Sequence, residues 1–557
     1  MARASTGAGR TVSAQSGVHP SRVRWLRGGA PAPGARYVLY WIQIHQRARH
    51  NDALDFAIEQ ANALGLPVVA YQGLRPDYPG ANDRLHTFIL EGAFDLRRSL
   101  AKKKILHLFH LERRPSAASG LIASLAREAA LVVTDHFPVF IVNGQARALA
   151  RSLERPVASV ESSCIVPSAL FPRTEFAART IRPKIHALLP EHLVPRADAR
   201  VKRSSLDLDI PFPFPGSGLE AEERVWLDLA GGAARRASGR ATATPTARAA
   251  RIAEWVASCA IDHRIAPSPA YPGGEEAARA RLRAFVSERL PDYPDARNDA
   301  AVDGVSGLSP YLHFGQISAL EIALAVLGAP AGSAALRSEP RRAARSEQRR
   351  TARSEHCRTV ARSLRRALSR RETPAGAFLE QLIVRRELCF NFCETNPHHA
   401  SIDGLPDWAR RTLDDHAGDP RRERYDAGAL EWAETADEVW NAAQTELRET
   451  GVIHNRLRML WGKKILEWSE TPAEAFRIMI DLHERYALDG RDPNTYANVL
   501  WCLGLHDRPF GPARPVLGTV RPMSTAVARK KMDIPAYVAR IARLARPAGP
   551  AGAAVRS

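Results

Sequence analysis

The first part of the chain alternates short apolar runs with amphipathic segments. Residues 36–42 (RYVLYWI) form a β-rich run of the kind that makes a buried strand. Asn51 and Asp52 then stand ahead of an amphipathic segment, residues 53–65, where a helix N-cap is expected. Strand and helix in turn predict a doubly wound, parallel α/β domain. The alternation continues with strands predicted at 66–71, 105–111 and 130–135 and helices at 82–104 and 119–129.

The pattern changes after a proline-rich connector at residues 209–218 and is helical from there to about residue 543. One helix start is well marked, because Thr471 is followed by Pro472 at the first helical position and by Glu474 at the capping-box position. The sequence therefore predicts an α/β domain followed by an all-helical domain.

Five regions are predicted: a mobile N-terminal segment (1–35), the α/β domain (36–165), a linker (166–220), the all-helical domain (221–543) and a disordered tail (544–557). A low-complexity insertion interrupts the helical domain at about residues 329–375, where the triplet RSE recurs from Arg337, Arg345 and Arg353. We expect the insertion to be exposed and disordered, either without a role or as an arm that grips DNA.

Charge changes this picture only slightly. The net charge of +19 suits a polyanionic partner such as nucleic acid. However, residues 337–371 hold 13 arginines and three glutamates, a net of +10, so about half of the excess lies in the insertion. The basic balance is therefore only supporting evidence for DNA binding.

Several classes of protein are excluded by what the chain lacks. No apolar run approaches the ~18 residues of a membrane span, and no secretion signal stands at the N-terminus, so a cytoplasmic protein of bacterial type with no membrane partner is expected. The six cysteines are scattered, which argues against a disulfide framework or a zinc site. GxGxxG, P-loop, nucleophile-elbow and HExxH motifs are absent, which argues against the usual dinucleotide enzymes, NTPases and hydrolases.

Tryptophans at regular spacing are the clearest chemical signal in the helical half. Trp440 lies near the start of one predicted helix, and Trp461 and Trp468, seven apart, share one face of the next. They are either core aromatics or the wall of a site for a flat, anionic, aromatic ligand. The second interpretation is favoured by the basic residues around them, Arg456, Arg458, Lys463 and Lys464.

Six short motifs follow one another along the second half of the chain: SPYLHFGQIS (309–318), FLEQLIVRREL (378–388), WNAAQ (440–444), KKILEW (463–468), LDGRDPN (488–494) and HDRPFG (506–511). Together with RYVLYWIQIHQRARHNDAL at 36–54, they resemble the class II cyclobutane pyrimidine dimer photolyases. The likeness covers most of residues 20–325 and 376–540.

The resemblance implies an antenna-type α/β domain and a helical domain that holds FAD in a bent shape. Reduced flavin in such enzymes absorbs blue light and passes an electron to a dimer flipped out of DNA, which splits the cyclobutane ring. The protein holds the flavin near the lesion, excludes water and stabilises negative charge. The implied partner is dimer-containing DNA, bound by a monomer. A second, antenna chromophore suits the α/β domain, but the sequence does not identify it.

The resemblance also assigns residues to the FAD site. Arg458 and Asp489 match the family's ion pair beside the isoalloxazine ring. The phosphates are expected to meet Ser306, Leu308 and Ser309, where backbone donors lie beside a helix start. Further contacts or supports are expected from Asn441, His483, Asp492 and Asn494.

Electron transfer and DNA contact are assigned in the same way. Trp440, Trp461 and Trp468 match the tryptophans that photoreduce the flavin, with Tyr425 nearby. The residues matched to the lesion or to the gap that it leaves in DNA are Arg297, Asn298, Gln381 and Trp501, of which Trp501 offers an aromatic wall for a flipped base.

Two positions depart from the family pattern at the expected reaction centre. Gln381 stands where the family has a glutamate that hydrogen-bonds the dimer, and a glutamine supplies neither a carboxyl proton nor a negative charge. His483 stands where the family has an asparagine facing flavin N5, and an imidazole is bulkier and titratable. A smaller change puts Gly307 in the phosphate loop in place of asparagine.

Three functions remain open from the sequence. The first is light-driven dimer repair, which Arg297, Asn298 and Trp501 favour. The second is a cryptochrome-like FAD photoreceptor with weakened or lost repair, which Gln381 and His483 favour. The third is a DNA-binding protein that has lost its cofactor, and the intact flavin motifs argue against it.

Overall fold

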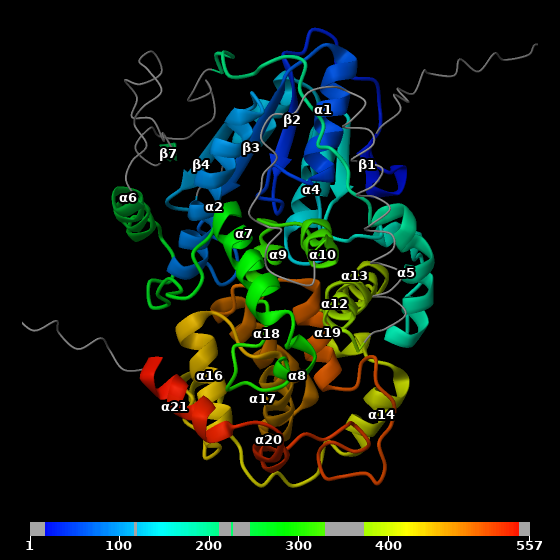
Figure 1. Cartoon of the computed structure of the whole chain (residues 1–557), viewed down its shortest axis with the longest axis vertical. Coiled ribbons are helices and arrows are strands. Elements are labelled where there is room, and N and C mark those ends of the chain that lie inside the picture. The colour runs from blue at the N-terminus through cyan, green and yellow to red at the C-terminus, as the bar shows by residue number, and fades with distance from the viewer. Residues whose placement is uncertain (1–16, 116–119, 211–223, 227–244, 329–371, 545–557) are drawn as a thin grey trace, which may run out of the picture.

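The computed structural model describes residues 17–115, 120–210, 224–226, 245–328 and 372–544. The predicted tail beyond Leu544 and nearly all of the predicted insertion therefore lie outside the described residues, as do residues 1–16 of the predicted mobile segment. Figure 1 shows a sheet domain above a helical domain, which confirms the predicted fold class.

A seven-stranded sheet forms the first domain, in the order β1-β6-β5-β2-β3-β4-β7. The five central strands are parallel, and the two edge strands, β1 and β7, are antiparallel to their neighbours. β2 is buried along its whole length, as its apolar run predicts. The strands are β1 Val23–Arg27, β2 Tyr37–Ile42, β3 Val68–Leu74, β4 Leu106–Glu112, β5 Ala129–His136, β6 Val157–Glu161 and β7 Arg224–Trp226.

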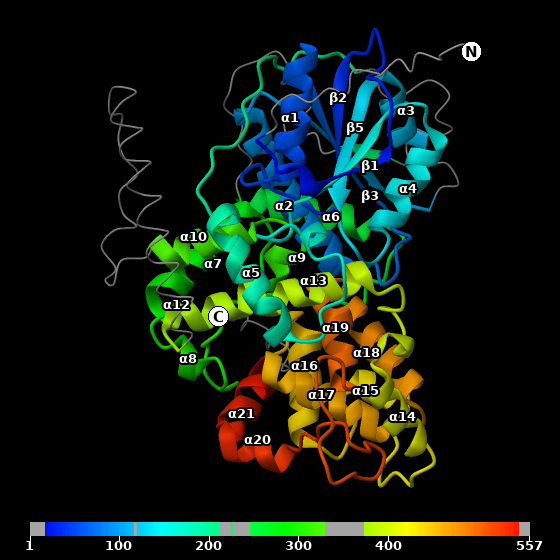
Figure 2. The same ribbon diagram turned by 90° about the vertical axis from the view of Figure 1, so that its right-hand side faces the viewer.

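Helices cover both faces of this sheet (Figure 2). One face packs Val38 and Tyr40 against α1 and α2, and the other packs Leu39 and Trp41 against α3 and α4. Asn51 caps α1 by accepting a hydrogen bond from the Leu54 amide, as the sequence predicts. The four helices are α1 Asp52–Leu64, α2 Asp83–Lys102, α3 Gly120–Glu128 and α4 Val142–Ser152.

The two edge strands correct the predicted regions. Residues 17–35 are not a mobile segment, because β1 pairs with β6 and the preceding Arg22 is buried in ion pairs with Asp52 and Glu161. β7 falls inside the region predicted to be all-helical, yet it pairs with β4. Such short edge strands are set by tertiary pairing and leave little periodic signal in the sequence.

The second domain is a layered set of helices, with α17 and α18 near its centre (Figure 1). Thr471 caps α18 by accepting from the Glu474 amide. Arg84 of α2 joins the domains by donating to the carbonyls of Leu447 and Tyr486. α6 Pro245–Ala257 packs on α2 of the sheet domain. The other helices that follow the sheet, 3-10 turns excluded, are α5 Ala178–His192, α7 Glu275–Ala284, the π-helical turn Phe285–Arg289, α8 Tyr293–Ala296, α9 Ser309–His313, α10 Ala319–Gly328, α12 Pro374–Leu379, the π-helical turn η6 Glu380–Arg385, α13 Arg386–Thr395, α14 Asp407–Asp415, α15 Ala427–Trp432, α16 Glu438–Thr450, α17 Asn455–Trp468, α18 Pro472–Tyr486, α19 Pro493–Cys502, α20 Thr525–Lys531 and α21 Ile534–Leu544.

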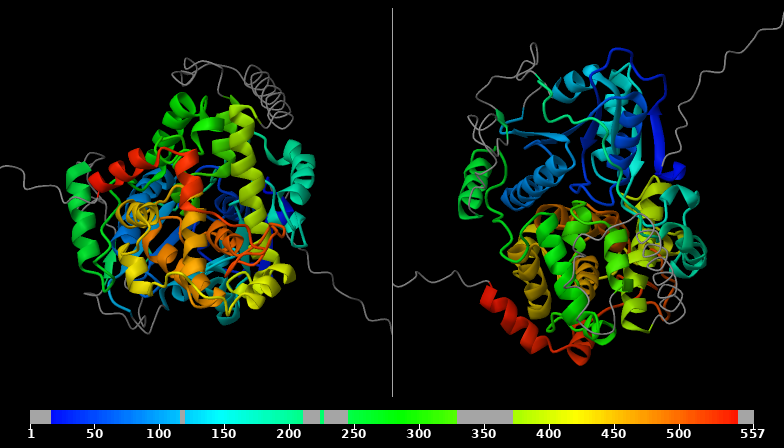
Figure 3. Two further views of the ribbon diagram at one scale, coloured as in Figure 1. Left: turned by 90° about the horizontal axis from the view of Figure 1, so that it is seen from below. Right: turned by 45° about the horizontal axis from the view of Figure 1, so that its top comes forward.

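α20 and α21 run along the end of the helical domain that is farther from the sheet, and they are red in Figure 3. α21 packs on α16 through the buried Tyr537, whose hydroxyl donates to Glu446. No helix among the described residues has the length and apolar character needed to cross a membrane.

Candidate FAD and DNA site

A large cavity of about 2080 Å³ opens in the helical domain. Its wall combines α8 and the loop that follows it, η6, α17, α19 and the C-terminal helices. The predicted site residues on this wall are Arg297, Asn298, Ser306, Leu308, Ser309, Gln381, Arg458, Trp468, Asp489, Asp492, Asn494 and Trp501. Residues far apart in sequence thus meet at one cavity.

Arg458 and Asp489 form an ion pair on the cavity wall. Nη2 of Arg458 lies 3.1 Å from Oδ1 of Asp489, and both side chains are largely buried. Burial acts to raise the pKa of Asp489, but Arg458 and the Ser309 hydroxyl outweigh it and lower the pKa below its usual value. Asp489 is therefore ionised at neutral pH, and the pair presents a fixed dipole to whatever fills the cavity.

The turn that carries Asp489 is held by a close backbone approach. A Cβ added at Gly490 would lie 2.0 Å from the carbonyl oxygen of His483, so glycine is required at this position. Asp492 then caps α19, accepting hydrogen bonds from the Asn494 amide (3.0 Å) and side chain (2.6 Å). Asp492 and Asn494 thus brace each other on the wall.

His483 is not among the residues that line the cavity, and the contact with the cofactor that the sequence predicts for it stays a prediction. It is 1% exposed and is absent from the cavity lining, because its Nδ1 donates to the Met479 carbonyl (2.7 Å) one turn back along α18. Its ring meets that of Trp461 edge to face, with centroids 4.9 Å apart. Burial and then Arg458 lower the pKa of His483 to about 4, so the imidazole is neutral at pH 7.

Asn441 is also outside the cavity lining, so its position suits a support rather than a direct contact, the two roles that the sequence left open for it. Its side chain accepts from the backbone amide and hydroxyl of Thr435 and donates to the Thr435 carbonyl. These bonds hold the chain that enters α16, so Asn441 braces that turn.

The predicted phosphate loop has a feature that explains its glycine. Gly307 adopts φ +62°, and a Cβ there would lie 2.6 Å from Nη1 of Arg281. The guanidinium of Arg281 also stacks over Tyr271 at 4.3 Å. α9, which follows the loop, has only five residues and so a weak dipole, whereas Arg281 places a full positive charge beside Gly307 of the loop.

The tryptophans form a continuous series of ring contacts through the core, one stacked and the others edge to face. The rings of Trp461 and Trp440 are parallel within 1° with centroids 6.3 Å apart, and Trp468 lies 5.3 Å from Trp440. Tyr425 follows, 5.0 Å from Trp468. The series therefore runs from the Arg458 helix toward the surface, where Trp468 and Lys464 border a smaller, open cavity.

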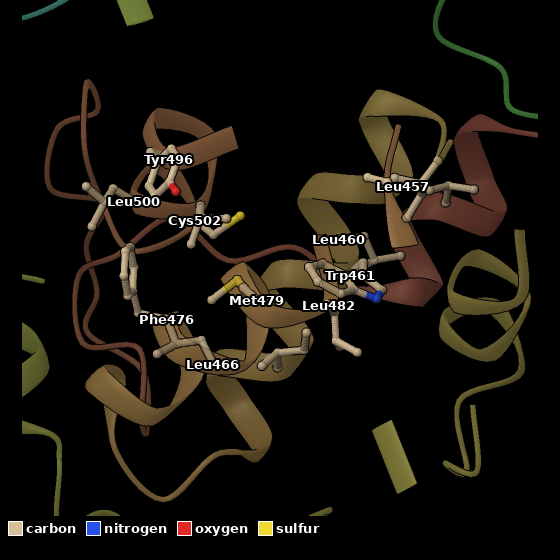
Figure 4. Packing of buried hydrophobic residues seen from close by; sticks show 14 of the residues in the cluster. Leu457, Leu460, Trp461, Leu466, Phe476, Met479, Leu482, Tyr496, Leu500 and Cys502 are labelled. Atoms are coloured by element: carbon tan, nitrogen blue, oxygen red, sulfur yellow. The ribbon is translucent and has the colours of Figure 1, made fainter. Parts of the chain in front are cut away.

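Hydrogen bonds fix the two inner rings. Nε1 of Trp440 donates to the carbonyl of Trp461 (3.0 Å), and Nε1 of Trp461 donates to Gln444 (2.9 Å). Figure 4 shows Trp461 beside Leu460 and above Leu482 in the apolar core. Fixed, dry rings are suited to electron transfer because little rearranges when charge passes.

Gln381 and Trp501 lie at another part of the same cavity. The guanidinium of Arg385 sits 5.5 Å from the Trp501 ring and pairs with Glu380, which also receives two hydrogen bonds from Arg182. The aromatic face of Trp501 is thus held next to positive charge, an arrangement suited to a base and its phosphates.

The Lys and Arg residues that line the cavity form a basic rim, and sequence reasoning missed much of it. The cavity is lined by 13 Lys or Arg and eight Asp or Glu residues, and several of the basic ones come from segments that carry no motif. These are Arg421, Arg422, Arg514, Arg521, Lys531 and Arg540. Only the fold brings them to one surface, so no pattern in the sequence could have identified them.

Known proteins resemble this chain in sequence and in fold. A family model described as DNA photolyase matches residues 38–202. Deoxyribodipyrimidine photo-lyase of Methanothermobacter thermautotrophicus is 36% identical over 525 residues, which cover 94% of this chain and 98% of that protein. The protein of the same name from Arabidopsis thaliana is 31% identical over 537 residues, covering 94% and 93%.

Two solved structures have the same fold. A bacterial class III photolyase from Agrobacterium tumefaciens superposes with a TM-score of 0.57 at 17% identity, covering 92% of this chain and 87% of that one. A cryptochrome from Synechocystis gives a TM-score of 0.57 at 15% identity, covering 92% and 89%. The helical cavity, the sheet domain and these likenesses agree, and the chain belongs to the photolyase/cryptochrome family.

Proposed function

We propose that this protein repairs cyclobutane pyrimidine dimers in DNA with light absorbed by reduced FAD. The single observation that carries the proposal is that one cavity holds both the Arg458–Asp489 pair and the Gln381–Trp501 wall. A flavin beside the first would then lie within the same enclosure as a flipped base beside the second. Electron transfer needs this proximity above all else.

The chemistry of the cavity wall fits FAD. Among the described residues, Nε of Arg458 and Nη2 of Arg386 are buried without a hydrogen-bond partner, and both side chains line the cavity. Buried donors of this kind need an acceptor, and flavin carbonyls and a pyrophosphate are rich in acceptors. FAD would supply the light absorption and the transferred electron. Arg458, Asp489 and the loop at Ser306–Ser309 would hold it.

The protein's own groups would keep the reaction centre electrostatically fixed. Arg458 stays charged and Asp489 ionised, so the pair can stabilise negative charge on a neighbouring ring. His483 is neutral and adds no charge behind them. The stack of Trp461, Trp440 and Trp468 would deliver electrons from the surface when the cofactor arrives oxidised.

The DNA end would use the basic rim and Trp501. Lys and Arg residues on the rim would neutralise phosphates on either side of the lesion, which makes binding salt-dependent. Flipping a base out of the duplex costs a few kcal/mol, and the cost is lowest at a damaged step. Binding by flipping therefore favours the lesion over undamaged DNA. Trp501, backed by Arg385, would stack against the flipped bases.

The direct test is illumination of the purified, flavin-loaded protein with a thymine-dimer oligonucleotide under anaerobic, reducing conditions. Loss of dimer, measured by chromatography, is expected in blue light and not in the dark. A matched control is Arg264→Ala, because Arg264 pairs with Asp262 at the surface and is not on the cavity wall. A protein that holds no flavin, or that leaves every dimer intact in the light, contradicts the proposal.

A second function, an FAD photoreceptor with weak or no repair, is favoured by Gln381. The residue lines the cavity and carries an uncharged amide, so it cannot donate a carboxyl proton to a dimer. Flavin that binds and photoreduces through the tryptophans while dimers persist would favour this alternative. Gln381→Glu and His483→Asn, singly and together, would then identify the position responsible.

A further inference from the structure

Two histidines and a carboxylate meet outside the cavity, where the N-terminal segment contacts the end of α5. His19 stands just before the 3-10 turn Pro20–Arg22, and Glu191 and His192 are the last residues of α5. One ligand atom from each of the three lies within 4.8 Å of the others. The sequence does not reveal this cluster, because His19 and His192 are far apart along the chain and no local motif links them.

The geometry of the cluster is that of side chains facing one another. The rings of His19 and His192 are 5.0 Å apart at 73°, and Nε2 of His19 lies 3.5 Å from Oε1 of Glu191. Nδ1 of His19 lies 2.7 Å from the Ser21 hydroxyl. The same nitrogen accepts a hydrogen bond from the Ser21 backbone amide (3.3 Å), so Nε2 is the ring nitrogen that faces Glu191.

His192 adds an observation that points to a missing ligand. The residue is half-buried, and its Nε2 is shielded from solvent and has no hydrogen-bond partner among the described residues. An unpartnered imidazole nitrogen beside a second imidazole and a carboxylate has the composition of a two-histidine, one-carboxylate site.

We propose that His19, Glu191 and His192 bind one divalent transition-metal ion, zinc by preference, which ties the N-terminal segment to α5. Imidazole and carboxylate ligands suit zinc, and three protein ligands leave a fourth position for water. Glu191 and His19 are partly exposed, with 65% and 37% of their side-chain surface accessible, so both can close on an ion held by His192. The bound ion would connect the edge of the sheet that β1 forms with α5, which packs against η6 of the helical domain.

The test uses the full-length, flavin-loaded protein without an affinity tag, stripped with a chelator and titrated with zinc chloride by calorimetry. One equivalent is expected to bind saturably and to raise the thermal midpoint. His192→Ala and the exposed Glu191→Gln are each expected to weaken binding at least tenfold and to abolish the rise in midpoint.

The matched control is His263→Ala. His263 is a surface histidine whose Nδ1 lies 2.7 Å from Asp83, and it does not belong to the proposed site. This variant is expected to bind zinc as the unmodified protein does. Circular dichroism shows whether each variant is folded. The proposal is overturned if no equivalent binds saturably, or if folded His192→Ala and Glu191→Gln proteins bind zinc with unchanged affinity, which would indicate adventitious binding elsewhere.

Discussion

His483 offers the sharpest test of the electrostatic argument, because it is a buried histidine between Trp461 and the Arg458–Asp489 pair. The change is His483→Asn, which keeps a polar side chain of smaller size and removes the titration. The folded-state pKa of His483 is lowered from 6.5 to about 4, by burial first and Arg458 second, against an opposing effect of Asp489. His483 is therefore protonated near pH 6.5 in the unfolded chain, but only near pH 4 in the folded protein.

The sign and size of the effect follow directly. The neutral His483 ring lowers no stability above pH 6.5, because it is then uncharged in both the folded and the unfolded protein. As the pH falls from 6.5 toward 4, the unfolded chain binds a proton that the folded protein does not, so the free energy of unfolding falls progressively. One pH unit corresponds to about 1.36 kcal/mol, so this interval is worth about 3 kcal/mol of unfolding free energy. Other buried histidines, such as His454 and His506, behave alike, so only the difference between the two proteins isolates His483.

The assay is urea unfolding of both proteins, followed by tryptophan fluorescence, at pH 7.5 and at pH 4.5. The unmodified protein is expected to lose more stability between the two conditions than His483→Asn, by between 2 and about 3 kcal/mol. Equal losses in both proteins would refute the reasoning, because they would mean that the His483 ring is hydrated or readily protonated in the folded state. A constant difference at both pH values would report packing alone.

Four other expectations follow from the cavity and its walls. Asp489→Asn leaves the Arg458 charge without its partner and is expected to lower the unfolding free energy by about 3 kcal/mol or more, and a double-mutant cycle with Arg458→Met that gives no coupling energy would contradict this. Trp440→Phe replaces the indole that joins Trp461 to Trp468 and is expected to slow photoreduction of bound flavin severely while leaving flavin affinity unchanged. An unchanged rate of photoreduction on illumination would exclude this path. Trp501→Ala is expected to weaken binding of dimer-containing oligonucleotide by about 1–3 kcal/mol and of undamaged duplex much less, and equal losses on the two would show that the ring contacts no flipped base. Charge removal at the rim, as in Lys531→Ala, is expected to lower the slope of log affinity against log salt by about 1, and an unchanged slope would place Lys531 off the DNA path.

Local pattern determined the order of the first domain and several helix ends. The buried run at β2, the Asn51 cap of α1 and the Thr471 cap of α18 depend on residues within a few positions of one another, so the sequence displays them. The motifs added the pairing of Arg458 with Asp489, and the structure brings these two side chains within 3.1 Å. The roles assigned to the cavity residues in catalysis stay predictions.

Tertiary packing alone decided the rest. Spacing could not show that Trp440 from α16 would lie parallel to Trp461 from α17, since a periodic pattern fixes a face of one helix and not its neighbour. Nor could it show that His483 would turn back to the Met479 carbonyl and leave the cavity wall to Arg458 and Asp489.

The sequence by itself determined that this chain folds as a sheet domain and a helical domain, because hydrophobic periodicity is a property of neighbouring residues. Only the tertiary structure decided the short edge strands, the gathering of six basic residues from separate loops and helices around the cavity, and the meeting of His19 with His192. These features join residues that are distant along the chain, and their proximity depends on how whole elements pack rather than on any local pattern.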